Sequence, residues 1–307
     1  MPASTRYPQG LLVSCEIPWN DQEELDEETF RKEIQHFLRC GFRHIYIFGT
    51  AGEGYAVDTR NFRKIVEMFY EETRRPDVYP QVGIIGLSTA NVRERIEIAY
   101  RAGFRMFQIS LPCWGALNDR EVVRFFREVC GAYTDSKFLH YNLLRSKRLL
   151  GAGDYRRIAD EVFNLVATKN TSPNVSFASE LMRSVPELQH FFGEAVFPTA
   201  CLHGECSLLS SFAPMFPSST LRFFELARNK RIEEALLLQR DYLDAVWTVI
   251  APMMQQERID GAYDKAIVRL GGFPMPLRLL SPYEPISEGA YLECMHILED
   301  NFHSWMG

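Results

Sequence analysis

The sequence predicts an α/β protein folded as a (β/α)8 barrel, the TIM-barrel fold, with a helical extension at its C-terminal end. Short apolar runs alternate eight times with segments of helical periodicity between residues 10 and 228. Such alternation is typical of a parallel sheet with right-handed crossover helices. Eight repeats in roughly 225 residues also match the size of a closed barrel. An open, doubly wound sheet is the alternative architecture.

The first four repeats have clear boundaries. Their strands are short apolar runs, expected at residues 10–18, 44–48, 82–86 and 106–111. Their helices carry apolar residues on one face and are expected at residues 27–40, 58–73, 88–102 and 118–132. Asp58, Ser88 and Asn118 suit helix N-caps, and Gly41 suits the end of the first helix.

The pattern weakens in the last four repeats. Their strands are expected at residues 138–142, 164–170, 188–193 and 205–209, and their helices at 154–162, 177–184, 199–202 and 220–228. We therefore expect residues 1–228 to form the barrel with the active site. Residues 229–307 form a C-terminal helical segment, with helices at 232–249, 263–270 and 287–302. This segment is expected to contact another subunit or partly cover a neighbouring face.

The composition describes an ordinary soluble globular protein, with 46% hydrophobic and 24% charged residues. The net charge is −6 and there is no basic block, which argues against a nucleic-acid partner. No apolar run approaches the ~20 residues needed to cross a bilayer, so no membrane association is expected. Met1 to Gly10 has no long apolar segment after a basic start, so we expect no secretory signal and a cytoplasmic location.

The seven cysteines are an odd number without framework spacing, which favours reduced thiols in a cytosolic protein over disulfides. One short segment, Cys201-x-His203-x-x-Cys206, resembles a metal site. It offers only three soft ligands in an apolar run, without a second cluster. We interpret it as core packing and expect no metal.

The most unusual residue is Lys169, which ends the apolar strand at 164–170. Burying an ammonium is costly and lowers its pKa. A lysine with a lowered pKa can attack a carbonyl and form a Schiff base. The alternative is a strand-end lysine that reaches water or pairs with a carboxylate.

In a barrel of this kind the functional residues lie at the carboxyl ends of the strands. The segments expected there are Gly49-Thr50-Ala51-Gly52-Glu53, Pro112-Cys113-Trp114, Tyr141-Asn142 and Lys169-Asn170. Strands five and six are neighbours, so Tyr141 and Lys169 are expected about one strand spacing, ~4.8 Å, apart. A phenol there suits a proton donor and relay, although a packed aromatic residue remains the alternative.

The glycine-rich segment after the second strand offers backbone N–H groups to a carboxylate or phosphate. A plain tight turn is the structural alternative. The Gly-x-x-Gly-x-Gly spacing of residues 49–54 does not match that of a dinucleotide-binding loop.

Taken together, these motifs resemble the dihydrodipicolinate synthase/N-acetylneuraminate lyase family, the pyruvate-type class I aldolases. The resemblance covers about Gly10 to Leu298. It rests on motifs in the right order: Gly49-Thr50-Ala51-Gly52-Glu53, Tyr141-Asn142, Lys169, Gly204 to Ser207, Ala213-Pro214-Met215-Phe216-Pro217 and Tyr263-Asp264-Lys265-Ala266.

The resemblance implies a (β/α)8 barrel in which Lys169 forms a Schiff base with a 2-oxo acid. Tyr141 would shuttle protons, with Thr50 in the relay. The candidate substrate-binding residues are Gly49, Ala51, Cys206, Trp114 and Arg145. The lysine imine is itself the electron sink, so the resemblance implies neither metal nor organic cofactor. It also implies a homodimer or homotetramer.

Several residues depart from the family pattern. Ala51 replaces a second threonine, and Leu144 stands where the motif has proline. Trp114 replaces a tyrosine that in the synthases completes a neighbour's proton relay, and an indole can donate but not accept a proton. The arginine for the second substrate is not clearly placed: Ser146 has the expected offset, with Arg145 and Arg148 nearby.

These departures argue against dihydrodipicolinate synthase itself and leave three hypotheses. The first is a Schiff-base lyase or aldolase acting on pyruvate or another 2-oxo acid. The second is a sugar-acid dehydratase that uses the same imine. The third is a non-catalytic relative that binds a small acid. The sequence does not identify the aldehyde or sugar-acid substrate, because acceptor specificity resides in loops.

Overall fold

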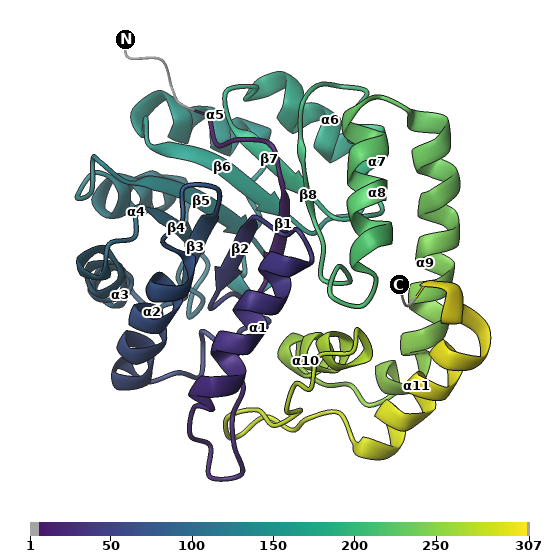
Figure 1. Ribbon diagram of the computed structural model, residues 1–307. Coiled ribbons are helices and arrows are strands. Elements are labelled where there is room, and N and C mark those ends of the chain that lie inside the picture. The colour runs from purple at the N-terminus through teal and green to yellow at the C-terminus, as the bar shows by residue number, and fades with distance from the viewer. Residues whose placement is uncertain (1–5, 306–307) are drawn as a thin grey trace.

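Eight parallel strands close into a barrel in the order β1 to β8, with β8 pairing back to β1 (Figure 1). The structure is a computed structural model that describes residues 6–305. Residues 1–5, which belong to the Met1–Gly10 segment considered for a secretory signal, and residues 306–307 lie outside the described residues. The closed barrel confirms the predicted (β/α)8 fold and excludes the open sheet.

The strands are β1 (Leu11–Ser14), β2 (His44–Ile47), β3 (Tyr79–Ile84), β4 (Met106–Ile109), β5 (Lys137–Asn142), β6 (Leu165–Asn170), β7 (Gln189–Phe192) and β8 (Ser207–Leu209). The barrel helices are α1 (Glu27–Arg39), α2 (Thr59–Thr73), α3 (Thr89–Ala102), α4 (Asp119–Cys130), α5 (Ala152–Glu161), α6 (Val175–Ser184), α7 (Phe197–Ala200) and α8 (Pro217–Arg228). Beyond them lie α9 (Ile232–Met254), α10 (Asp260–Leu270) and α11 (Glu288–Phe302), and short 3-10 turns occur at Leu144–Ser146 and His303–Trp305.

The predicted helix caps form. Asp58, Ser88 and Asn118 are the N-caps of α2, α3 and α4, and each side chain accepts from a backbone N–H of the first turn. Gly41 follows α1 with a φ of 96°, the left-handed conformation that glycine adopts without steric cost. These local signals explain why most helix starts could be predicted from the sequence.

Helices α5, α6, α7, α8 and α10 begin two or three residues earlier than predicted, and the reason can be identified for α5 and α7. Helix α5 begins at Ala152 instead of Asp154, because the Asp154 carboxylate lies inside the first turn and accepts from Gly151 N at 3.0 Å. Helix α7 begins at Phe197, two residues earlier than predicted, with Pro198 in its first turn. Proline suits this position since the N–H it lacks would have no helical partner.

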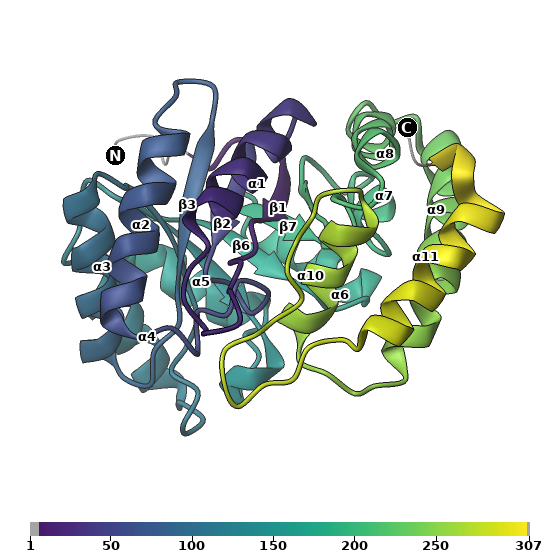
Figure 2. The same ribbon diagram turned by 60° about the horizontal axis from the view of Figure 1, so that its bottom comes forward.

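The C-terminal helices pack against the barrel. Helices α9 and α11 lie side by side, and α10 lies between them and the barrel (Figures 1 and 2). Phe273 and Met275, which follow α10, belong to the same apolar cluster as the barrel helices. Within residues 6–305, no helix is long and apolar enough to span a membrane.

Candidate active site

Lys169 lies near the carboxyl end of β6 and is only 3% exposed. Its Nζ atom donates a hydrogen bond to the Tyr46 hydroxyl at 2.8 Å and lies 3.9 Å from the centroid of the Tyr141 ring. Burial lowers the pKa of Lys169 to about 7, although Asp264, Asp260 and Glu16 oppose the shift. The amine therefore neither reaches bulk water nor forms a salt bridge with any carboxylate within residues 6–305.

Tyr141 is the direct neighbour of Lys169, because these two residues are register partners in the β5–β6 pair. Burial raises the pKa of Tyr141 to about 12. The phenol is therefore neutral at physiological pH. Thr50 is 4% exposed, and its Oγ1 atom has no hydrogen-bond partner among the described residues. A buried hydroxyl without a partner costs free energy unless a ligand satisfies it.

The turn after β2 is tightly packed on two sides. Phe48 and Glu53 both have left-handed backbones, with φ of 60° and 55°. Gly49 faces the Tyr46 ring so closely that an added Cβ would lie 2.6 Å from a ring carbon. On the other side, a Cβ on Gly261 of α10 would lie 2.7 Å from the Ala51 carbonyl oxygen. Strained backbone of this kind is often found at functional sites.

Helix α10 brings two carboxylates to the site that the sequence analysis did not single out. Asp264 is 8% exposed, and its pKa is well above the usual value because of burial and the nearby charges of Glu16 and Asp260. Asp260 accepts two hydrogen bonds from Arg145, at 2.8 and 3.0 Å. In the sequence, Asp264 stands out only as part of the Tyr263-Asp264-Lys265-Ala266 motif, in a segment expected to make contacts and not to take part in chemistry.

Tyr46 and Glu16 are the other site residues that sequence reasoning missed. Tyr46 lies on β2 and is 3% exposed, and Glu16 follows β1 and is 1% exposed. Alternation along each strand could have indicated them, since residues two apart point to the same side. Glu16 directly follows an apolar strand, as Lys169 ends one, and a charged residue at either position is unusual enough to indicate a functional site.

Arg145 stays close to the site, whereas two other predicted substrate-binding residues do not line it. The Trp114 side chain is 81% exposed. Cys206 precedes β8 and therefore lies at the amino end of the strand, with its sulfur 3.6 Å from that of Cys201. Because Lys169 is at the carboxyl end of β6, the barrel separates it from Cys206. The structure therefore places Cys206 away from Lys169, and Trp114 lies on the surface; their binding roles stay predictions.

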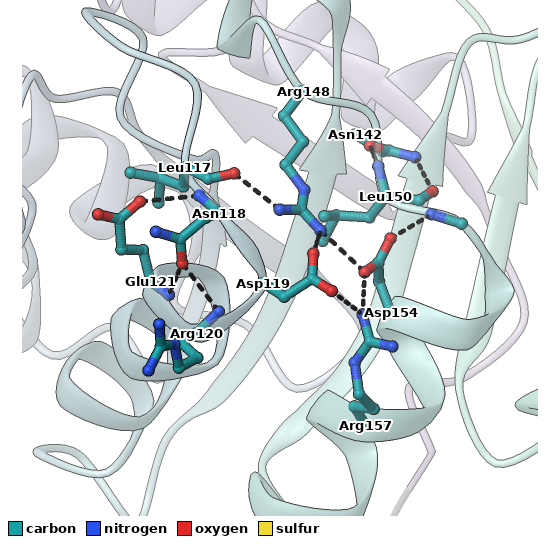
Figure 3. Close-up of polar contacts among 11 residues, drawn as sticks. Leu117, Asn118, Asp119, Arg120, Glu121, Asn142, Arg148, Leu150, Asp154 and Arg157 are labelled. Atoms are coloured by element: carbon teal, nitrogen blue, oxygen red, sulfur yellow. Dashed lines mark hydrogen bonds and ion pairs between the residues drawn. The ribbon is translucent and has the colours of Figure 1, made fainter.

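Arg148, the other arginine near the expected position, has a structural role (Figure 3). Its guanidinium donates to Asp119 at 2.6 Å and to Asp154 at 3.0 Å, which ties the start of α4 to the start of α5. In the same region, the Asn142 side chain exchanges two hydrogen bonds of 2.9 Å with the Leu150 backbone. Since Asn142 follows Tyr141, this network fixes the strand end that carries the phenol.

The described residues offer no metal centre. Within residues 6–305, no group of three or more His, Cys, Asp or Glu side chains is arranged to hold a metal ion. Cys201 and Cys206 are buried, whereas His203 is exposed and contacts Ser179. In the segment that resembles a metal site, the two cysteines therefore lie in the core and His203 lies on the surface.

The chain is similar to known proteins over most of its length. The family model described as "Dihydrodipicolinate synthetase family" matches residues 7–301. A 4-hydroxy-tetrahydrodipicolinate synthase of Chlorobium phaeobacteroides is 24% identical over 78% of this chain and 81% of its own. N-acetylneuraminate lyase 2 of Escherichia coli is 20% identical over 91% of this chain and 90% of its own.

Among solved structures, the chain is similar to YagE, a prophage protein of the dihydrodipicolinic acid synthase family from Escherichia coli K12, in complex with pyruvate. The TM-score is 0.84 at 18% identity, over 95% of this chain and 97% of that one. At this identity the likeness shows the fold alone. The family model, however, spans nearly the whole sequence, and on that match this protein belongs to the dihydrodipicolinate synthetase family.

Proposed function

We propose that this protein is a lyase or aldolase that uses Lys169 as a Schiff base to make or break a carbon–carbon bond next to a 2-oxo acid such as pyruvate. The observation that carries the proposal is the buried Lys169 amine, with a pKa of about 7, beside the Tyr141 ring. A large fraction of such an amine is neutral at physiological pH and can act as a nucleophile. The similar proteins include a synthase and a lyase.

In this mechanism the neutral amine attacks the ketone carbon of the 2-oxo acid and forms a carbinolamine. The carbinolamine oxygen then takes up a proton and leaves as water, which gives an iminium ion that withdraws electrons from the adjacent carbon. Tyr141 is the proposed proton donor, because its raised pKa keeps the phenol protonated. Thr50 is proposed to link Tyr141 to the substrate, since its Oγ1 atom has no other partner among the described residues.

The substrate carboxylate is proposed to bind at the turn that follows β2. The backbone N–H groups of Thr50 and Ala51 are the proposed donors there. Ala51 offers no hydroxyl, so the carboxylate loses one donor compared with the family's threonine while the N–H remains. Arg145 is held near this end of the barrel by Asp260 and is the proposed contact for the second substrate.

We further propose a cytoplasmic homodimer or homotetramer that needs neither metal nor organic cofactor, because the iminium ion itself accepts the electrons. Light scattering coupled to size-exclusion chromatography measures the subunit number. Activity after exhaustive treatment with a metal chelator should equal that of untreated protein.

Borohydride reduction tests the proposed function. The protein is incubated with each of several 2-oxo acids, reduced, and weighed by intact-mass spectrometry. The wild type should gain the mass of one reduced adduct, and Lys169→Met should gain none. Absence of an adduct on the wild type across the whole panel would instead favour a non-catalytic acid-binding protein, a role that the departures at Ala51 and Leu144 leave open. Where an adduct forms, product analysis with 2-keto-3-deoxy acids distinguishes carbon–carbon cleavage from loss of water.

A further inference from the structure

The turn that follows β2 leans over β3. Gly83 of β3 has no side chain, and a Cβ added there would overlap the Phe48 carbonyl oxygen and lie 2.8 Å from that of Ile47. The backbone at the end of β2 therefore occupies the place that a side chain of β3 would otherwise fill. Glycine at position 83 is what allows the turn to come this close to the next strand.

Gln108 of β4 points into the barrel beside this turn. It is the register partner of Gly83 on β3 and of Leu139 on β5, and register partners on parallel strands point to the same side of the sheet. Leu139 precedes Tyr141 by two residues, so both face the interior of the barrel, where Tyr141 meets Lys169. The Gln108 side chain therefore lies on the same side, one strand away from Gly83.

The carboxamide of Gln108 reaches the start of the turn. Its Nε2 atom lies 3.5 Å from the place where a Cβ on Gly49 would be. The side chain is only 3% exposed, and its Oε1 atom has no hydrogen-bond partner among the described residues. Thr50, the next residue of the turn, also has a buried hydroxyl without such a partner. Buried polar atoms of this kind are costly unless a ligand or an ordered water satisfies them.

We propose that Gln108 completes the carboxylate-binding site at this turn, by donating an N–H of its carboxamide to the carboxylate of the 2-oxo acid. The inference rests on the proposed Schiff-base function. It adds a side-chain donor to the backbone N–H groups of Thr50 and Ala51. Gln108 contacts the substrate and sets the affinity for the acid, and it takes no part in bond making or breaking at Lys169.

Ala51 gives the site a need for such a donor. An alanine at this position offers the carboxylate a backbone N–H but no hydroxyl, whereas an ionised carboxylate can accept about four hydrogen bonds. Apart from the adjoining residues of the chain, the atoms nearest to a Cβ on Gly49 are two carbons of the Tyr46 ring and Gln108 Nε2. A donor missing from the turn is therefore replaced by one on the neighbouring strand β4.

A carboxamide suits this position because it carries no charge. Lys169 is 3% exposed, so the interior around it is a place where an unpaired charge is costly. Gln108 can donate to an anion while it remains neutral with or without substrate. The iminium ion formed at Lys169 then carries the positive charge that balances the substrate carboxylate.

Gln108→Leu tests the proposal, because it removes the donor with little change in volume. The measured quantity is the pyruvate concentration that gives half of the maximal rate of borohydride-trapped adduct. This concentration should rise about 10- to 100-fold, the usual effect of losing a hydrogen bond to a charged group. In the Gln108→Leu background, Ala51→Thr returns a hydroxyl to the turn and should bring the concentration back toward the wild-type value.

Acetone distinguishes carboxylate binding from a purely structural role of Gln108. It has a ketone that can form an imine with Lys169 but no carboxylate. The wild type and Gln108→Leu should therefore trap acetone with the same concentration dependence. A loss with acetone as large as that with pyruvate would overturn the proposal.

Gln189→Leu is the matched control. Gln189 is also buried with an Oε1 atom that lacks a partner among the described residues. Its Nε2 atom donates to Ser207 Oγ at 2.6 Å, and both residues are the first of their strands, at the amino end of the barrel. This variant should keep the wild-type pyruvate concentration. Far-UV circular dichroism verifies that each variant is folded, and Gln108→Met replaces Gln108→Leu if the latter does not fold.

The outcomes separate this inference from the proposed function. If the wild type traps pyruvate while the folded Gln108 variant keeps the same half-maximal concentration, Gln108 does not bind the carboxylate and the Schiff-base lysine stands. If the wild type forms no adduct, both proposals fall together.

Discussion

Within residues 6–305 two lysines are buried, Lys169 and Lys265, and their ammonium groups have different surroundings. Lys265 of α10 is fully buried and forms a 2.5 Å ion pair with Glu53. Lys169 is buried among phenols and forms no such pair within residues 6–305. Burial lowers the pKa of both, but at Lys265 the Glu53 carboxylate in direct contact opposes the shift. On the proposed function, what distinguishes Lys169 from Lys265 is therefore the absence of a contacting anion and not burial itself.

The ion pair has a separate structural purpose. Glu53 accepts hydrogen bonds from Trp19 Nε1 at 2.9 Å and from Leu280 N at 2.8 Å in addition to Lys265. It thus joins the turn after β2 to the C-terminal segment. This junction holds α10, and with it Asp264, against the mouth of the barrel.

The largest difference between the two lysines should appear in catalysis. Lys169→Met should reduce imine formation to the uncatalysed background, because methionine fills a similar volume without an amine. The variant should also unfold at a higher temperature than the wild type, since a desolvated amine has been replaced by an apolar group. Trapping and thermal unfolding measure the two effects. A variant that retains trapping would show that another lysine carries the reaction.

The same substitution at the other lysine should have the opposite effect on stability. Lys265→Met leaves the buried Glu53 carboxylate unpaired, and removing one partner of a buried pair costs about 3–5 kcal/mol. Urea unfolding measures the loss. The double variant Glu53→Gln, Lys265→Met should lose less than the sum of the single variants. Equal stability of Lys265→Met and the wild type would contradict the assigned role of the pair.

The rate of imine formation and the stability should both depend on pH through the lowered pKa of Lys169. The Lys169 amine is protonated below pH 7 and neutral above it, so imine formation should rise as the pH increases through about 7. Between a pH of about 7 and the ordinary lysine pKa of 10.5, the unfolded chain binds a proton at Lys169 that the folded chain does not. The contribution of Lys169 to stability therefore becomes more favourable as the pH rises across that window. Trapping rates across pH test the first effect. A rise only near pH 10 would mean that burial does not lower this pKa.

The smallest effect on stability is expected at the exposed Arg145–Asp260 ion pair, which also joins α10 to the barrel. Arg145 and Asp260 are 50% and 42% exposed, so solvent screens their attraction. Arg145→Ala should cost less than about 1 kcal/mol of stability, while weakening the binding of the second substrate. Urea unfolding and the KM for that substrate separate the two effects. A stability loss as large as that of Lys265→Met would be inconsistent with this ranking.

Much of the fold, and part of the site around Lys169, could be predicted from local sequence patterns. The alternating pattern predicted the barrel, and neighbouring strands placed Tyr141 beside Lys169, because parallel strands in register bring their carboxyl ends together. Tyr46 could not be placed in the same way, since its contact with Lys169 exists only once β1 and β8 close the barrel. Asp264 arrives on a helix outside the barrel repeat, whose docking no local pattern specifies.

The placement of Cys206 away from Lys169 has a related cause. A short motif near a strand does not say which end of the strand it occupies, and β8 begins one residue after Cys206. Loop residues such as Trp114 are placed by packing that strand periodicity does not describe.

In the proposed function Lys169, and not the other buried lysine, forms the imine. The direct measurement is peptide mapping of the wild type after borohydride reduction with pyruvate, comparing the peptides that contain Lys169 and Lys265. We expect the reduced adduct on Lys169 and an unmodified Lys265. An adduct on Lys265, or none on Lys169 across the panel of 2-oxo acids, would contradict it.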